Sequence, residues 1–351
     1  MESIEKAQLT SRETTASARS RWRRIGPIVT LLVLAPFVSE VLFGGTRVSV
    51  IFVFIPEIMT WGCGALLIRY WVRRWQKGWG SMLLLGLALA AAEELVIQQT
   101  SIAPLAGLAK NAYGREFGVN WVYLLWALGY ESVWVVLVPV QFTELLFPGC
   151  REDVWLRTRG MVIASVVFTL GSFMAWYSWT QRARVQVFHM APYSPPPMYL
   201  FVGAAVVAML ILAGYALPNR KSGVIVSRTA PSPWLVGMAT CILGSPWAAF
   251  ALFGFGTYPN IPYTLVLGGG LTWGAVTLFL LMRWTASPGW GDSQRYALVF
   301  GGVLACMIGG FAVFKVGGAL RIDWIGKAVL NAATLVWLIV LGRRERSRRV
   351  N

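Results

Sequence analysis

The chain has little charge for its length and only one histidine, the residue that soluble enzymes use most often for acid–base catalysis. Only 13% of its 351 residues are charged, 56% are apolar, and the mean hydropathy is +0.60. A soluble domain cannot bury so much apolar surface, so the composition excludes a water-soluble globular protein. The single histidine, His189, argues against a zinc centre or a Ser–His nucleophile.

Other absences narrow the class further. The four cysteines have no metal-ligand spacing, and the sequence contains no phosphate-binding loop or dinucleotide fingerprint. We therefore expect no metal and no cofactor. The net charge of +16 is typical of nucleic-acid binders, but the lysines and arginines flank apolar runs instead of forming a basic domain, so we expect no nucleic-acid partner.

Long apolar runs dominate what is present. A run of about 20 apolar residues crosses a hydrocarbon core of roughly 30 Å as a helix. The sequence predicts an all-α polytopic membrane protein, in contact with a lipid bilayer, with about ten spans. These are expected at 25–43, 48–70, 79–100, 119–147, 160–180, 198–217, 234–255, 262–283, 296–314 and 322–342.

The positive charges predict the orientation. Most lysines and arginines fall in the leader, the C-terminal tail and every second loop, which places both termini in the cytoplasm of a bacterium whose plasma (inner) membrane holds the chain. The basic tail is expected to touch anionic lipid. The expected organisation is a disordered cytoplasmic leader, a first four-helix unit, two connecting helices, a second four-helix unit and the tail: 1–24, 25–147, 148–233, 234–342 and 343–351.

The two four-helix units resemble each other. "TWGCGALLIRYW" (60–71) followed by "GWG" (78–80) resembles "TWGAVTLFLLMRW" (272–284) followed by "GWG" (289–291). This pattern suggests a parallel internal repeat, with spans one to four duplicated as spans seven to ten. The alternative is that tryptophan, glycine and arginine recur at any membrane boundary.

Glutamates inside the expected spans mark a candidate site. A charged side chain at mid-bilayer costs roughly 3 kcal/mol or more, so it usually faces protein or water. All such glutamates lie in the first unit: Glu40, Glu57, Glu93, Glu94, Glu131 and Glu144. At about 1.5 Å of rise per residue, all but Glu144 reach similar heights between the midplane and the outer third of the membrane.

This arrangement predicts one acidic pocket that opens outward. Clustered carboxylates cannot all stay ionised in a low dielectric, which suits a proton relay, a cation site or general acid–base chemistry. Gln98, four residues after Glu94, is expected to orient it on one helix face. Pro56 is expected to kink the helix beside Glu57. The alternative is that the glutamates are protonated and hydrogen-bond between helices as packing.

The stretch "EELVIQ" (93–98) resembles the Glu-Glu-x-x-x-Arg motif of the CAAX-protease and bacteriocin-processing (CPBP, or Abi) intramembrane proteases, with Gln98 in place of the arginine. The resemblance implies that Glu93 and Glu94 would activate water for peptide hydrolysis. In that family later helices supply histidines, which have no counterpart in these spans.

Three hypotheses thus stay open: a transporter-like protein with a proton, cation or solute site, a divergent intramembrane protease, and a membrane scaffold without chemistry. Whether the chain is an enzyme is left undecided. For the transporter-like form the ion, proton or substrate site is expected at Glu93, Glu94, Gln98, Glu57, Glu131 and Glu40. For the protease, Glu93 or Glu94 would polarise water.

Overall fold

A computed structural model of the chain describes residues 25–104, 113–218, 229–316 and 318–350. Within these ranges, nine helices are long and apolar enough to cross a membrane, and a shorter apolar helix, Ile25–Val41, precedes them. These ten helices match the ten expected spans, so the prediction of an all-α polytopic membrane protein is confirmed. The expected leader, 1–24, lies outside the described residues.

The elements follow in chain order. After the first helix come α2 (Phe54–Glu57), α3 (Cys63–Arg74), α4 (Trp79–Ala92), α5 (Trp121–Tyr130), α6 (Val138–Leu146), α7 (Thr158–Trp176) and α8 (Arg184–Gln186). The second half holds α9 (Pro197–Ala216), α10 (Pro233–Ala249), α11 (Ala251–Gly254), α12 (Tyr263–Thr285), α13 (Asp292–Val316) and α14 (Arg321–Val350). A two-residue antiparallel hairpin pairs β1 (Arg115–Glu116) with β2 (Val119–Asn120).

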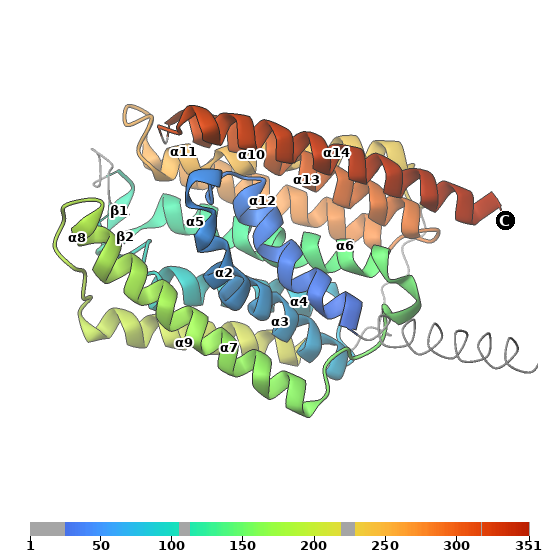
Figure 1. Ribbon diagram of the computed structural model, residues 1–351, viewed down its shortest axis with the longest axis horizontal. Helices are drawn as coiled ribbons and strands as arrows, with labels where there is room; N and C mark the ends of the chain where they lie inside the picture. Colours follow the sequence, from blue (N-terminus) through green and yellow to red (C-terminus); the bar gives the residue numbers. More distant parts are fainter. Residues whose placement is uncertain (1–24, 105–112, 219–228, 317, 351) are drawn as a thin grey trace, which may run out of the picture.

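The long helices run side by side, so the bundle has two ends (Figure 1). We call the end that carries β1 and β2, with residues 42–47 and 98–104, the hairpin end. We call the end where α14 finishes, with residues 147–157, the terminal end. The sequence predicts that the hairpin end faces outward. The expected basic tail is helical and continues α14 as far as Val350.

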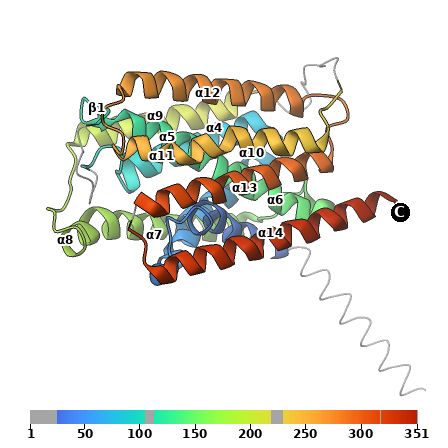
Figure 2. The ribbon, with the colours of Figure 1, turned by 90° about the horizontal axis from the view of Figure 1, so that it is seen from above.

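Burial separates inner from outer helices. In the apolar windows of Trp79–Ile97 and Asp292–Lys315, 61% of residues are buried, whereas the share is 11% in Thr158–Gln186, Pro197–Ala216 and Tyr263–Thr285. Figure 2 shows α12 on one outer side of the bundle and α14 on the other, with α10 and α13 between them. The inner helices therefore carry the packing, and the outer ones present apolar side chains to lipid.

Two apolar clusters meet on the first helix and on the span Trp121–Leu146. The larger one joins both to the second four-helix unit and includes Leu34, Val38, Tyr130, Trp134, Val303 and Leu338. The smaller one joins both to the second, third and fifth spans and includes Leu31, Leu66, Leu85, Val136 and Ala164. The first helix is therefore packed between the two halves of the chain, and its side chains contact both halves.

Candidate functional site

Each of the five glutamates predicted for the site lies at a π-helical turn. The turns that hold or directly follow them are Phe37–Val41 with Glu40, Ile58–Gly62 after Glu57, Glu93–Ile97 with Glu93 and Glu94, and Glu131–Leu137 with Glu131. A π turn is rare, costs regular hydrogen bonding and is frequent at functional sites. Among the described residues of the second four-helix unit there is no such turn.

A π turn leaves backbone carbonyls without their usual helical partners. In the turn that holds Glu40, side chains contact two of these carbonyls instead. The hydroxyl of Tyr130 donates to the Ser39 carbonyl at 2.7 Å, and the Cys306 thiol lies 3.2 Å from the Val38 carbonyl. Buried backbone oxygens are nearly always paired, so these contacts are what allows the irregular turn inside the bundle. Cys306 belongs to α13, so the second unit helps to hold the turn that carries Glu40.

Glu94 and Glu131 lie close enough for their carboxyl groups to interact electrostatically. Two carboxylates have only acceptors, so their repulsion is relieved when one of them holds a proton. Glu94 accepts a hydrogen bond from the Ser101 hydroxyl at 2.7 Å. Ser101 follows the end of the third span, where the sequence shows no periodic pattern that would have pointed to it.

Gln98, expected as the partner of Glu94, takes a different place. It follows the π turn Glu93–Ile97 as its C-terminal cap, with its backbone N–H bonded to the Glu93 carbonyl at 2.8 Å. The spacing of four residues brings side chains together in an α-helix, whereas a π turn holds more residues per turn and moves the fifth residue off that face. The hydrogen bond that the Glu94 side chain accepts therefore comes from Ser101.

The other glutamates adjoin this pair. Glu40 interacts electrostatically with Glu57 and Glu93, and Glu93 with Glu94. The Thr46 hydroxyl donates to the Glu57 carboxylate. Four early spans thus bring their acidic side chains to one place, which we call the glutamate cluster: Glu40, Glu57, Glu93, Glu94 and Glu131. Around Pro56 the second span is divided into 3-10, α and π pieces, an irregularity of the kind expected there.

Several oxygens of the glutamate cluster are buried without a donor. Within the part of the chain that the structure describes, both carboxyl oxygens of Glu93 and one each of Glu57 and Glu131 have no hydrogen-bond partner. Unsatisfied buried oxygens are costly, so they mark either a strained functional site or groups that bind something.

The cluster is closed at the hairpin end rather than open as expected. Glu57, Glu93 and Glu94 are 1–4% exposed, and Ser101 above them is fully buried. Glu40 and Glu131 are half-buried. Residues 98–104 form a cover over these carboxyl groups at the hairpin end. They carry no apolar or polar periodicity, so the sequence did not predict this cover.

Polar side chains from the other loops hold this cover in place. Arg115 donates to the Ile102 and Ala103 carbonyls at 3.0 and 2.7 Å, and Arg184 to Pro104 at 2.8 Å. The Tyr193 hydroxyl donates to Ile102 at 3.1 Å. Burial raises the pKa of Tyr193, so its hydroxyl keeps its proton and this hydrogen bond at neutral pH. Arg184 therefore has a structural role in this cover.

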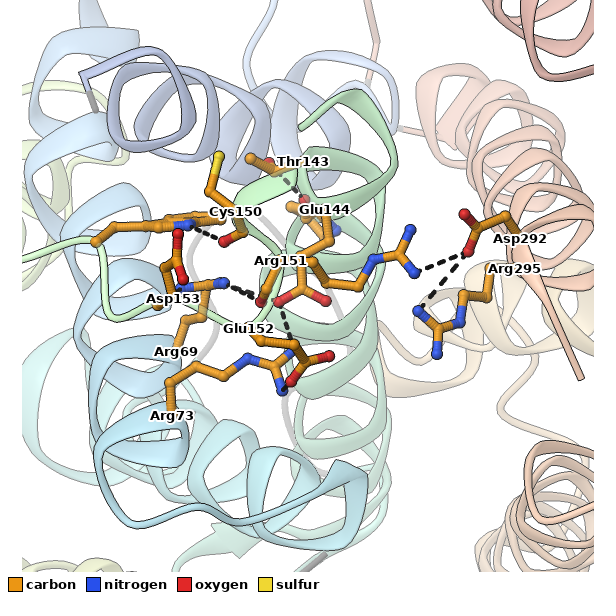
Figure 3. A network of polar contacts seen from close by, with 12 residues as sticks. Arg69, Arg73, Thr143, Glu144, Cys150, Arg151, Glu152, Asp153, Asp292 and Arg295 are labelled. Carbon is orange, nitrogen blue, oxygen red and sulfur yellow. Dashed lines mark hydrogen bonds and ion pairs between the residues drawn. The ribbon is translucent and has the colours of Figure 1, made fainter. Parts of the chain in front are cut away.

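Glu144 lies apart from the cluster, at the terminal end, as its position in the fourth span predicts. Figure 3 shows it between two arginines of α3: it accepts from Arg69 at 3.0 Å and from Arg73 at 2.6 Å. Arg69 is 1% exposed, donates to the Arg151 and Asp153 carbonyls and stacks on Trp155. An arginine near the end of a span usually extends to water, but this buried network holds Arg69 inside the bundle.

Among the described residues, no group of three or more His, Cys, Asp or Glu side chains has an arrangement that could hold a metal ion. Comparison of the chain with protein-family models, with curated proteins and with solved structures finds no match. The class of the protein therefore follows from its own helices: it is a multi-pass α-helical membrane protein with a buried cluster of glutamates in its first four spans.

Proposed function

We propose that the glutamate cluster is the proton-binding site of a transporter-like membrane protein. The clustering of these glutamates, with four of their carboxyl oxygens buried without a donor, carries this proposal, because such a group cannot stay fully ionised in a low dielectric. Intramembrane carboxylates in transporters commonly relay protons. Glu40, Glu93, Glu94 and Glu131 form a chain of interacting groups along which a proton can pass.

The π turns give the site a way to change state. Converting a π turn into α geometry removes one residue from the turn and rotates the rest of the helix by about 100°. Such a change at Glu93–Ile97 would turn Glu94 away from Ser101 and open the cover over the cluster. The closed arrangement supports an occluded state between two openings of the site.

The membrane that holds the chain and its orientation there are part of the same proposal. The lysines and arginines that the sequence concentrates in the two terminal segments and in every second loop favour a bacterial plasma membrane with both termini in the cytoplasm. The basic tail is then on the cytoplasmic side, where it favours anionic lipid. In this orientation the glutamate cluster lies nearer the outer surface.

Proton flux into proteoliposomes tests the proposed function. With an imposed pH gradient and a dye inside the vesicles, we expect Glu93→Gln to lower the flux by about a hundredfold, as loss of a positioned proton-transfer group does. Glu152→Gln is the matched control, since Glu152 is 60% exposed at the terminal end. Equal flux for wild type, Glu93→Gln and empty vesicles would contradict a proton-transport role.

The same variant separates the other hypotheses. Cleavage of a peptide by the purified protein, abolished in Glu93→Gln, would support the divergent intramembrane protease that the "EELVIQ" stretch resembles. A protein that neither conducts protons nor cleaves peptides, and whose Glu93→Gln and Glu94→Gln variants behave as wild type in cells, would be a scaffold.

A further inference from the structure

Lys327 is a buried lysine that lies outside the glutamate cluster. It lies on α14 near the hairpin end and is 2% exposed. Its ammonium group donates to the carbonyls of Leu42 and Phe43 at 2.6 and 3.2 Å. Lysines near the ends of membrane helices usually extend to water. The side chain is instead directed into the bundle, against the end of the first helix.

Carbonyl oxygens and aromatic faces surround the ammonium group, and the Arg47 guanidinium lies over one of these rings, Phe314, at 5.5 Å. The Phe311 and Phe314 ring centres lie 4.9 and 5.1 Å from Nζ, within the range of cation–π attraction. Among the described residues no carboxylate forms an ion pair with it. The Leu42 and Phe43 carbonyls follow the last turn of the first helix, where the helix dipole concentrates negative charge.

Two glycines make room for this arrangement. A methyl group at Gly310 of α13 would lie 2.7 Å from Nζ and would overlap the Phe43 carbonyl. A methyl group at Gly44, whose φ is +99°, would lie 3.5 Å from Nζ and would overlap the Phe314 ring. The backbone therefore approaches the ammonium group more closely than any other residue would allow.

The segment held by Lys327 also borders the glutamate cluster. The Gly44 and Thr46 amides both bond the Glu40 carbonyl, at 2.7 and 3.2 Å, and the Thr46 hydroxyl bonds Glu57. One turn earlier on α14, Asp323 accepts from the Ser49 amide at 2.9 Å. Asp323 and Lys327 thus fix both sides of the connection between the first two spans.

We propose that the chain contains a monovalent-cation site, formed by the Leu42 and Phe43 carbonyls and the Phe311 and Phe314 rings, which the ammonium group of Lys327 fills. Carbonyls at helix ends and aromatic faces are ligands for such cations in membrane proteins. When the lysine is shortened, the site accepts a small primary ammonium ion from solution. The second four-helix unit, which carries none of the clustered glutamates, then positions Glu40 through this cation.

Thermal melting of the purified protein tests the proposal without reference to transport. Lys327→Ala is expected to lower the apparent Tm by about 5 °C or more, since two charge-assisted hydrogen bonds are lost. Ethylammonium should restore the Tm of this variant saturably, whereas tetramethylammonium, which has no N–H to donate, should not. Lys315→Ala, an exposed lysine of α13, is the matched control and should melt as wild type in both salts.

Two results would overturn the proposal: a Lys327→Ala protein that melts as wild type, or equal effects of the two ammonium salts on it. If Lys327→Ala does not fold, Gly310→Ala takes its place, because the added methyl group crowds the ammonium group. It should lower the Tm, while Gly269→Ala on α12, with open space around it, should not. Equal melting of these two glycine variants would also contradict the proposed site.

Discussion

Replacing Glu144 with alanine is expected to lower the free energy of unfolding by about 3–5 kcal/mol, the usual cost of breaking a buried ion pair. Arg69 and Arg73 share this carboxylate, and their side chains are only 1% and 10% exposed. Without it, two guanidinium groups remain in a low-dielectric region with no anion between them. The yield of folded protein and its melting temperature in detergent measure the effect.

Glu152 provides the control for this prediction, because it pairs with the same Arg73 at 3.3 Å but is 60% exposed. An exposed ion pair contributes about 0–1 kcal/mol, so Glu152→Ala should melt close to wild type. Similar losses in the two variants would mean that burial does not decide the strength of this network, and would contradict the structural role given to Glu144.

Glu93→Gln is expected to make the protein more stable while it removes activity. Both carboxyl oxygens of Glu93 are buried without a donor, which costs about 1–3 kcal/mol. An amide in their place supplies two N–H donors next to the carboxyl groups of Glu40 and Glu94. The apparent Tm should rise by about 2–4 °C for each kcal/mol gained.

The neighbouring glutamate should respond in the opposite direction. Glu94 already accepts a hydrogen bond from the Ser101 hydroxyl. Glu94→Gln replaces this carboxylate acceptor with a neutral amide oxygen, which is a weaker acceptor, so its Tm should fall. If Glu93→Gln also melted below wild type, Glu93 would be part of the helix packing, as the alternative interpretation of the sequence holds.

The sequence was sufficient for the helices and for the choice of glutamates. A span of about 20 apolar residues can form little else than a membrane helix, and the rise per residue placed Glu40, Glu57, Glu93 and Glu131 at similar depths. The position of Glu144 within its apolar run also separated it from the other glutamates, at a different height in the membrane. The parallel repeat of the two four-helix units stays a prediction, because similar helix boundaries arise with or without duplication.

The details of the site depend on tertiary packing that no local pattern encodes. Apolar periodicity assumes α geometry, so it gave Gln98 as the partner of Glu94 and missed the π turn between them. Residues 98–104 have no periodicity, which hid Ser101. Lysine and arginine near a span end are typical membrane anchors, so the sequence gives no sign that Lys327 and Arg69 lie inside the bundle. Only the packing of distant helices shows that both are buried.

Infrared spectroscopy of the protein in lipid tests the central claim, that the glutamate cluster keeps an exchangeable proton at neutral pH. We expect a carbonyl stretch of protonated carboxylic acid in the wild type. This band should shift in D₂O and should be lost in the Glu94→Gln, Glu131→Gln double variant. A wild-type spectrum without this band at neutral pH, or a band that the double variant retains unchanged, would contradict this claim.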